Sequence, residues 1–165
     1  MRPKAALGGI GMKRTEVITV DGLDENKKKI AVMCLASACD VLETDGGSVM
    51  LLDKDGRNLT VTAAAGDNKH NAIGQKVVVG ERVSGKAAAT KKPVLVQGKV
   101  DVAKDKAFRE MKQFEKINSG LSVPIIKGEK LLGVLNLKRT EKEAALGAAE
   151  TKKAEIFARE LASAL

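Results

Sequence analysis

The residues best suited to chemistry in this chain are Ser84 and Gly85, at the predicted start of a short helix that continues to Thr90. Unpaired backbone N–H groups and the helix dipole favour an anion at such a position. Lys86 and Thr90 follow at helical spacing and can extend an anion site. A simple capping role is the favoured interpretation of Ser84, and Lys86 and Thr90 can simply face water. The pattern therefore indicates a candidate anion site beside a purely structural alternative.

Acid–base and thiol chemistry would rest on three other residues. His70 is the only histidine, so a general base has to be this residue or a carboxylate with a shifted pKa. It stands in a segment rich in Gly, Asn and Asp, where exposure without function is the alternative. Cys34 and Cys39 are five residues apart in one predicted helix, which turns them toward different faces and does not suit a local disulfide. We expect buried, unreactive thiols and, with so few soft ligands, no metal site.

The charge pattern indicates which classes of partner the chain can bind. The chain has a formal net charge of +8, contains no Trp or Tyr, and carries its lysines in scattered pairs and triplets such as residues 27–29. Nucleic-acid readers usually gather Arg and Lys on one surface and add aromatic or amide side chains, so specific nucleic-acid binding is not expected. A solvated basic surface that attracts acidic partners weakly is the expectation. No apolar run approaches the ~20 residues that span a bilayer, so we expect no membrane insertion and a cytoplasmic location.

The elements that would position these residues fit one domain within 165 residues. Residues 1–22 are predicted to be a flexible tail in which Thr15 to Val20 alternates enough to form a short strand, and residues 23–165 to be the folded domain. A first helix should begin near Leu23 with Asp24 as its cap and reach about Glu43. Further expected elements are strands at Ser48–Leu52, Leu59–Ala65 and Gln75–Val79, a loop and short helix at Val100–Lys116, and a final helix at Glu141–Leu165.

Four short signals follow one another in fixed order along the middle of the chain. They are Val83-Ser84-Gly85, Lys92-Pro93-Val94-Leu95-Val96, Ser122-Val123-Pro124-Ile125 and Leu132-Gly133-Val134-Leu135-Asn136-Leu137. The second reads as a strand opened by proline, and the last two read as a hairpin that turns at Lys127-Gly128-Glu129. Together they make the chain resemble a GAF domain over roughly Leu23 to Leu165.

The resemblance implies an α+β fold: a central six-stranded antiparallel sheet with the N- and C-terminal helices on one face and a ligand cup with short helices on the other. In such a cup the wall would draw on Val83–Thr90 and on the region from Val100 to Phe114. The hydroxyls of Ser119 and Ser122 can point into it, although strand alternation cannot place both there. The candidate ligand-binding residues are Ser84, Gly85, Lys86, Thr90, Asp101, Phe108, Ser119 and Ser122. Asp101 can equally cap the next helix.

The resemblance also implies a role for the two terminal helices in dimerisation. In this family they commonly form a dimeric bundle, and the candidate interface residues are Ala31, Leu35, Ala38, Leu42, Ala154, Ala158, Leu161 and Ala162. The resemblance thus implies a non-catalytic signal-transduction domain that binds a nucleotide or metabolite and relays this through helix packing to a signalling protein or fused output domain. The alternatives are a ligand-free dimerisation module and a GAF-type free methionine sulfoxide reductase. The ligand and any cofactor stay unknown.

Overall fold

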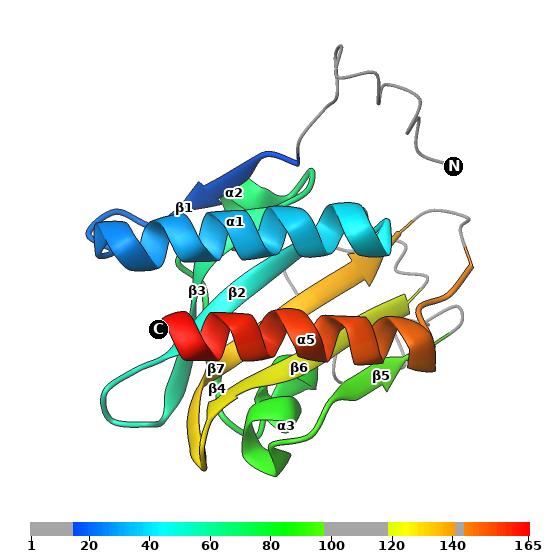
Figure 1. The fold of residues 1–165 in the computed structure, drawn as a ribbon. Coiled ribbons are helices and arrows are strands. Elements are labelled where there is room, and N and C mark those ends of the chain that lie inside the picture. Colours follow the sequence, from blue (N-terminus) through cyan, green and yellow to red (C-terminus); the bar gives the residue numbers. More distant parts are fainter. Residues whose placement is uncertain (1–14, 98–118, 141–143) are drawn as a thin grey trace.

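A computed structural model describes residues 15–97, 119–140 and 144–165. In these ranges the strands form one sheet in the order β1-β3-β2-β7-β6-β5, and β4 also pairs with β3. Every pairing among them is antiparallel. Helices α1 and α5 lie side by side, running in opposite directions, on one face of the sheet, while α3 lies on the other (Figure 1). The α+β fold expected from the sequence is thereby confirmed.

The elements follow the predicted order. The strands are β1 (Val17–Thr19), β2 (Gly46–Leu52), β3 (Asn58–Ala65), β4 (Lys76–Val78), β5 (Val94–Val96), β6 (Ser119–Lys127) and β7 (Lys130–Arg139). The helices are α1 (Glu25–Leu42), α2 (Lys69–Ala72), α3 (Arg82–Thr90) and α5 (Ala148–Ala164). The region from Val100 to Lys116, predicted as a loop and short helix, lies outside the described residues.

Helix α1 begins where the sequence predicted it. The carboxylate of Asp24 accepts hydrogen bonds from the backbone N–H groups of Asn26 (3.1 Å) and Lys27 (3.2 Å), which otherwise have no partner in the first turn. Helix α5 starts later than predicted, at Ala148, after the N–H of Gly147 donates to Oε1 of Glu150 (2.7 Å). Such side-chain caps fix helix starts more sharply than the apolar pattern does.

Two elements add to the expected plan. Val17–Thr19 pairs with Ala63–Ala65 as β1, within the stretch where the sequence predicted a short strand, and it is a seventh strand beyond the six that the resemblance implied. The polar segment that carries His70 contains the single-turn helix α2. The ion pair between Lys69 and Glu16 (3.3 Å) joins this helix to the residue before β1.

Strand alternation divides the core into two layers. On the helix-covered face, Val49, Leu121 and Leu135 belong to one buried cluster with side chains of α1 and α5. On the opposite face, which we call the cup face, Met50 and Val134 pack with small side chains of α3. Successive side chains of a strand point to opposite faces, so each strand contributes to both layers.

The eight residues expected at a dimer interface lie in the core of a single chain instead. None is more than 3% exposed: Ala31, Leu35, Ala38, Leu42, Ala154, Ala158, Leu161 and Ala162. All eight belong to the buried cluster between the two helices and the sheet. The small side chains let α1 and α5 approach each other closely, so the stripes that suggested a partner chain are used within the domain.

Strands β2 and β7 approach each other unusually closely at Gly133, which lies opposite Leu51. A Cβ atom built on Gly133 would lie 1.9 Å from the backbone oxygen of Met50 and 3.0 Å from its carbonyl carbon. Nearby, a Cβ on Gly47 would lie 2.5 Å from the backbone oxygen of Asn136. These positions therefore require glycine because of space, and neither has a positive φ.

Arg139 fastens the end of β7 to the end of α1 and to the segment that leads to α5. Its guanidinium donates hydrogen bonds to the backbone oxygens of Leu42 (2.6 Å) and Glu43 (3.3 Å), at the C-terminus of α1. It also donates to the backbone oxygen of Ala144, in the segment that leads to α5. A cation at this place complements the negative end of the helix dipole, and the last turn of α1 contains no basic residue of its own.

Candidate functional site

The clearest polar feature inside the fold is a row of three neutral side chains across β2, β7 and β6, which we call the cup row: Ser48, Asn136 and Ser122. The hydroxyl of Ser122 donates to Oδ1 of Asn136 (2.6 Å), and Nδ2 of Asn136 donates to the hydroxyl of Ser48 (3.0 Å). In the sheet register Asn136 is paired directly with Ser48 on one side and Ser122 on the other. The row therefore crosses the middle of the sheet.

The cup row lies on the cup face. Asn136 stands two residues after Val134, and Ser48 two residues before Met50, both of which pack on that face. Ser122 is only 4% exposed, whereas Ser48 and Asn136 are partly exposed. Burying polar groups in a sheet costs free energy unless they form hydrogen bonds, and each of these three forms at least one with a neighbour in the row. The arrangement can bind a polar molecule by hydrogen bonds without a charged side chain in the row.

Of the two predicted serines, only Ser122 lies on the cup face. Ser119 is three residues away and therefore on the helix-covered face, where it is fully buried. Its hydroxyl accepts a hydrogen bond from the N–H of Leu146 (2.8 Å), and Nε2 of Gln97 donates to the oxygen of the same residue (3.1 Å). Ser119 thus helps to hold the segment before α5, which corrects its assignment to the cup.

The two residues predicted to start the anion site, Ser84 and Gly85 of α3, are buried against neighbouring segments of the chain. The helix begins at Arg82, so Ser84 and Gly85 lie inside the first turns and are buried. The oxygen of Gly85 accepts a hydrogen bond from the N–H of Gly80 (2.8 Å), and a Cβ on Gly85 would lie 2.5 Å from the oxygen of Val78. The signal that suggested anion binding therefore reflects tight packing against β4 and the turn after it.

The other predicted ligand-binding residues do not join the cup row. Lys86 and Thr90 are exposed on α3, where the Thr90 hydroxyl donates to the backbone oxygen of Lys86 (2.8 Å). Asp101 and Phe108 lie outside the described residues. Ser48 and Asn136 were missed, although each is a polar residue at an alternating position in an otherwise apolar strand, which is the signal that could have found them.

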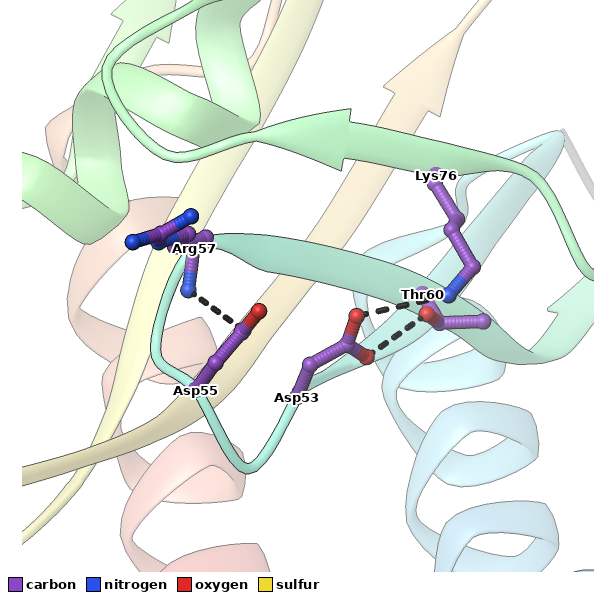
Figure 2. Close-up of polar contacts among 5 residues, drawn as sticks. All are labelled: Asp53, Asp55, Arg57, Thr60 and Lys76. Carbon is purple, nitrogen blue, oxygen red and sulfur yellow. Dashed lines mark hydrogen bonds and ion pairs between the residues drawn. The ribbon is translucent and has the colours of Figure 1, made fainter.

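A second polar cluster lies at the turn between β2 and β3 (Figure 2). Asp53 accepts hydrogen bonds from the Thr60 hydroxyl (3.0 Å) and from Nζ of Lys76 (3.3 Å), and Asp55 accepts one from the backbone N–H of Arg57 (3.0 Å). Thr60 and Lys76 are also paired in register between β3 and β4. The cluster ties the turn to β4, which accounts for these groups without a ligand.

The described ranges contain neither a cluster of metal-ligating side chains nor a helix that could span a membrane. There, no group of three or more His, Cys, Asp or Glu side chains gathers as a metal site. His70 is exposed in α2. No helix in residues 15–97, 119–140 or 144–165 is both long enough and apolar enough to cross a bilayer.

The two cysteines lie on α1, across the sheet from the cup row. Neither forms a disulfide, and Cys39 is fully buried while Cys34 is partly buried. Burial raises the pKa of the Cys34 thiol, and the carboxylate of Glu160 on α5 raises it further. Both causes disfavour the thiolate, which is the nucleophilic form, so Cys34 is held in its unreactive state at neutral pH.

We expect the folded protein to alkylate slowly at Cys34. With iodoacetamide at pH 7.5, the rate at this residue should be at least about tenfold below that of the unfolded chain and should rise as the pH passes above the ordinary thiol pKa of roughly 8.5. Glu160→Gln removes a negative charge that opposes ionisation, so it should speed the reaction, whereas Glu129→Gln, at the β6–β7 turn, should not. Tandem mass spectrometry locates the label. Equal rates in wild type and Glu160→Gln would contradict the coupling.

The architecture defines a class: an antiparallel sheet with the terminal helices on one face and a polar row on the other. Solved structures share this fold. The GAF domain of an Acinetobacter phosphoenolpyruvate-protein phosphotransferase superposes with a TM-score of 0.70 at 19% identity, covering 87% of this chain and 84% of that one. The second GAF domain of DevS from Mycobacterium smegmatis gives 0.67 at 17% identity, covering 84% and 91%. A free methionine-R-sulfoxide reductase from Neisseria meningitidis gives 0.66 at 16% identity, covering 85% and 77%.

The sequence itself leads to the same family. The family model for the GAF domain matches residues 25–165. No curated protein matches the chain. The chain belongs to the GAF domain family, whose members commonly serve in sensing and signalling, and this confirms the resemblance that the sequence carries.

Proposed function

We propose that this GAF domain is a non-catalytic regulatory module that binds a small molecule, a nucleotide or metabolite, on its cup face. The observation that supports this most directly is the cup row, which places two hydroxyls and a carboxamide in the middle of an otherwise apolar sheet face. Apolar side chains at these three adjacent central positions would bury more favourably, so stability of the sheet alone does not account for the row.

The proposed relay runs along β7. Asn136 lies on the cup face, and Arg139, three residues further along the same strand, holds the end of α1 and the segment before α5. A ligand that binds one arrangement of β7 better than another shifts the population of helix packings by its difference in affinity. The output would be a second copy of the chain, a fused domain or a separate signalling protein in the cytoplasm.

The test is binding combined with hydrogen exchange. Nucleotides, amino acids, organic acids and sugars are screened by thermal shift, where a ligand at ~100 times its dissociation constant adds roughly 2.7 kcal/mol to the free energy of unfolding. We expect a binding compound to change amide exchange in β7, at the end of α1 and in the segment before α5, which are the places that Arg139 contacts. Saturating compounds of every class that leave both stability and exchange unchanged would overturn the proposal.

A ligand-free dimerisation module is the second candidate, favoured by apolar side chains on the outer surface of the terminal helices. Met33 (68% exposed) and Val41 (53%) lie two turns apart on α1, and Ile156 (49%) lies on α5. Both helices cover the same sheet face (Figure 1). A contiguous apolar patch on a protein surface marks an interaction site, and if these side chains form one, a second copy would supply the same apolar residues in return.

We expect a dimer held by this outer surface to dissociate when charges are introduced. The double variant Met33→Asp with Ile156→Asp should raise the dimer dissociation constant at least about 100-fold, since unpaired carboxylates would be buried at the interface. Val78→Asp changes an exposed apolar residue on β4 and serves as the control that should stay dimeric. Sedimentation equilibrium measures each. A wild-type monomer at high micromolar concentration would reject this candidate.

A sulfoxide reductase activity, as in the Neisseria neighbour, is not favoured. Both cysteines lie on α1, on the opposite side of the sheet from the cup row, and burial disfavours the Cys34 thiolate. Turnover of free methionine sulfoxide that disappears when Cys34 and Cys39 are changed to serine would reverse this view.

A further inference from the structure

The carboxamide of Asn136 is held by both neighbours in the sheet. A carboxamide has two N–H donors and two oxygen lone pairs. One N–H is used by Ser48 (3.0 Å) and one lone pair by Ser122 (2.6 Å). Because Ser48 and Ser122 are the cross-strand neighbours of Asn136 in β2 and β6, these bonds engage the two flanks of the group. Within the described residues, one N–H and one lone pair are left over, side by side.

Because both serines lie to the sides of Asn136 within the sheet, we infer that the unused N–H and lone pair share the outer edge of the carboxamide. Hydroxyls donate and accept equally, so exchanging the amide oxygen and nitrogen would leave the same two bonds and the same unused pair. The flanking bonds also stop the group from rotating, since a turn of the amide plane would break both. Asn136 thus presents a fixed donor and acceptor, which lowers the entropic cost of binding a complementary edge.

This inference rests on the proposed function. We propose that the cup binds a ligand that carries a hydrogen-bond donor and an acceptor side by side: a primary or cis-secondary amide, or the amide-like edge of a nucleobase. Two parallel hydrogen bonds to Asn136 would hold that edge, as asparagine does in bidentate contacts with adenine. A carboxylate offers only acceptors and an ammonium group only donors, so each would bring a like group against half of the Asn136 edge.

The test compares matched probes on the folded wild-type chain by ligand-observed NMR titration. The pairs are uracil with 1,3-dimethyluracil and nicotinamide with methyl nicotinate, in which the second member lacks the N–H donor. We expect at least one unblocked probe to bind about tenfold or more tightly than its blocked partner, because a lost hydrogen bond in a partly buried site leaves its partner unsatisfied.

A variant pair then assigns the effect to Asn136. In Asn136→Asp both hydroxyls can donate to the carboxylate, so the cup row is kept while the donor is lost, and the unblocked probe should bind at least about tenfold more weakly. Asn71→Asp, an exposed position on α2, makes the same change away from the cup and should leave binding unaltered. Circular dichroism and thermal unfolding verify that both variants fold.

Three results would overturn the inference: neither member of any pair binds, both members of each pair bind alike, or Asn136→Asp binds the unblocked probe as tightly as wild type. The screen for the proposed function separates the two failures. If organic acids or sugars bind and change hydrogen exchange in β7 while the amide probes do not bind, the proposed regulatory function stands and the proposal of amide recognition by Asn136 is wrong. If no class of compound binds, both are wrong.

Discussion

Gly133→Ala is expected to destabilise the domain more than any other single methyl group added to the sheet. The new Cβ would lie 1.9 Å from the oxygen of Met50, a backbone atom that cannot move aside without separating β2 from β7. Over-packing of this kind costs 1–3 kcal/mol in ordinary cores, and we expect about 3 kcal/mol or more here because backbone is displaced rather than side chain. For a domain of this length that corresponds to a fall in melting temperature of roughly 6–12 °C.

Gly120→Ala is the matched control. Gly120 is also a buried strand glycine, on β6, but no atom of the described residues lies within 4 Å of a Cβ built there, and its φ is not positive. Alanine at such a position should be neutral or stabilise by about 0.4–1 kcal/mol through the unfolded state. Urea unfolding measures both variants. A Gly133→Ala protein as stable as Gly120→Ala would show that β2 and β7 are not in close contact at Leu51.

Arg139→Ala is expected to lower the free energy of unfolding by about 2–4 kcal/mol. Its guanidinium donates to the oxygens of Leu42, Glu43 and Ala144, and bonds from a charged donor contribute about 1.5–3 kcal/mol each in isolation, with less than additive effect in a shared group. Removing it leaves the C-terminal carbonyls of α1 without that donor and without a compensating positive charge.

Arg139→Lys separates charge from geometry. Lysine keeps the positive charge but not the planar fork that reaches three oxygens, so it should recover less than half of the loss. Arg159→Ala, at an exposed site on α5, should change stability by no more than about 0.5 kcal/mol. Chemical unfolding gives the free energies, and hydrogen exchange should show faster opening at the end of α1 in Arg139→Ala. An effect equal to that of Arg159→Ala would contradict the fastening role.

Local signals predicted the elements well because each depends on neighbours in sequence. Asp24 caps α1 through N–H groups two and three residues away, and the turn at Lys127-Gly128-Glu129 joins β6 to β7 as expected. The start of α5 was placed too early because Glu150, which closes onto Gly147, is a weaker sequence signal than the apolar stripe that follows it.

The candidate site was harder to predict because it depends on register between distant strands. Asn136 meets Ser48 across 88 positions, and no local pattern states which residue of β2 will lie opposite which residue of β7. Alternation alone did separate Ser119 from Ser122 onto opposite faces, but it could not say which of them faces the cup.

The amphipathic stripes of the terminal helices show a different limit of prediction from sequence. The stripe that contains Leu35 and Ala38 is apolar whether it meets a sheet, the other terminal helix or a partner chain, and the pattern is the same in each case. Only the folded arrangement shows that these residues are consumed within one domain and that Met33 and Ile156 are the ones left outside.

The way the sheet ends has a consequence for how the protein behaves when concentrated. The alanine-rich strand β3 would offer eight residues of open backbone, but β1 pairs with one half of its outer side and β4 with the other. The outermost described strands, β1, β4 and β5, are each three residues long, and β5 follows Lys91, Lys92 and Pro93. Short edges flanked by lysine and proline give another chain little to pair with, so the fold carries its own protection against strand-to-strand aggregation.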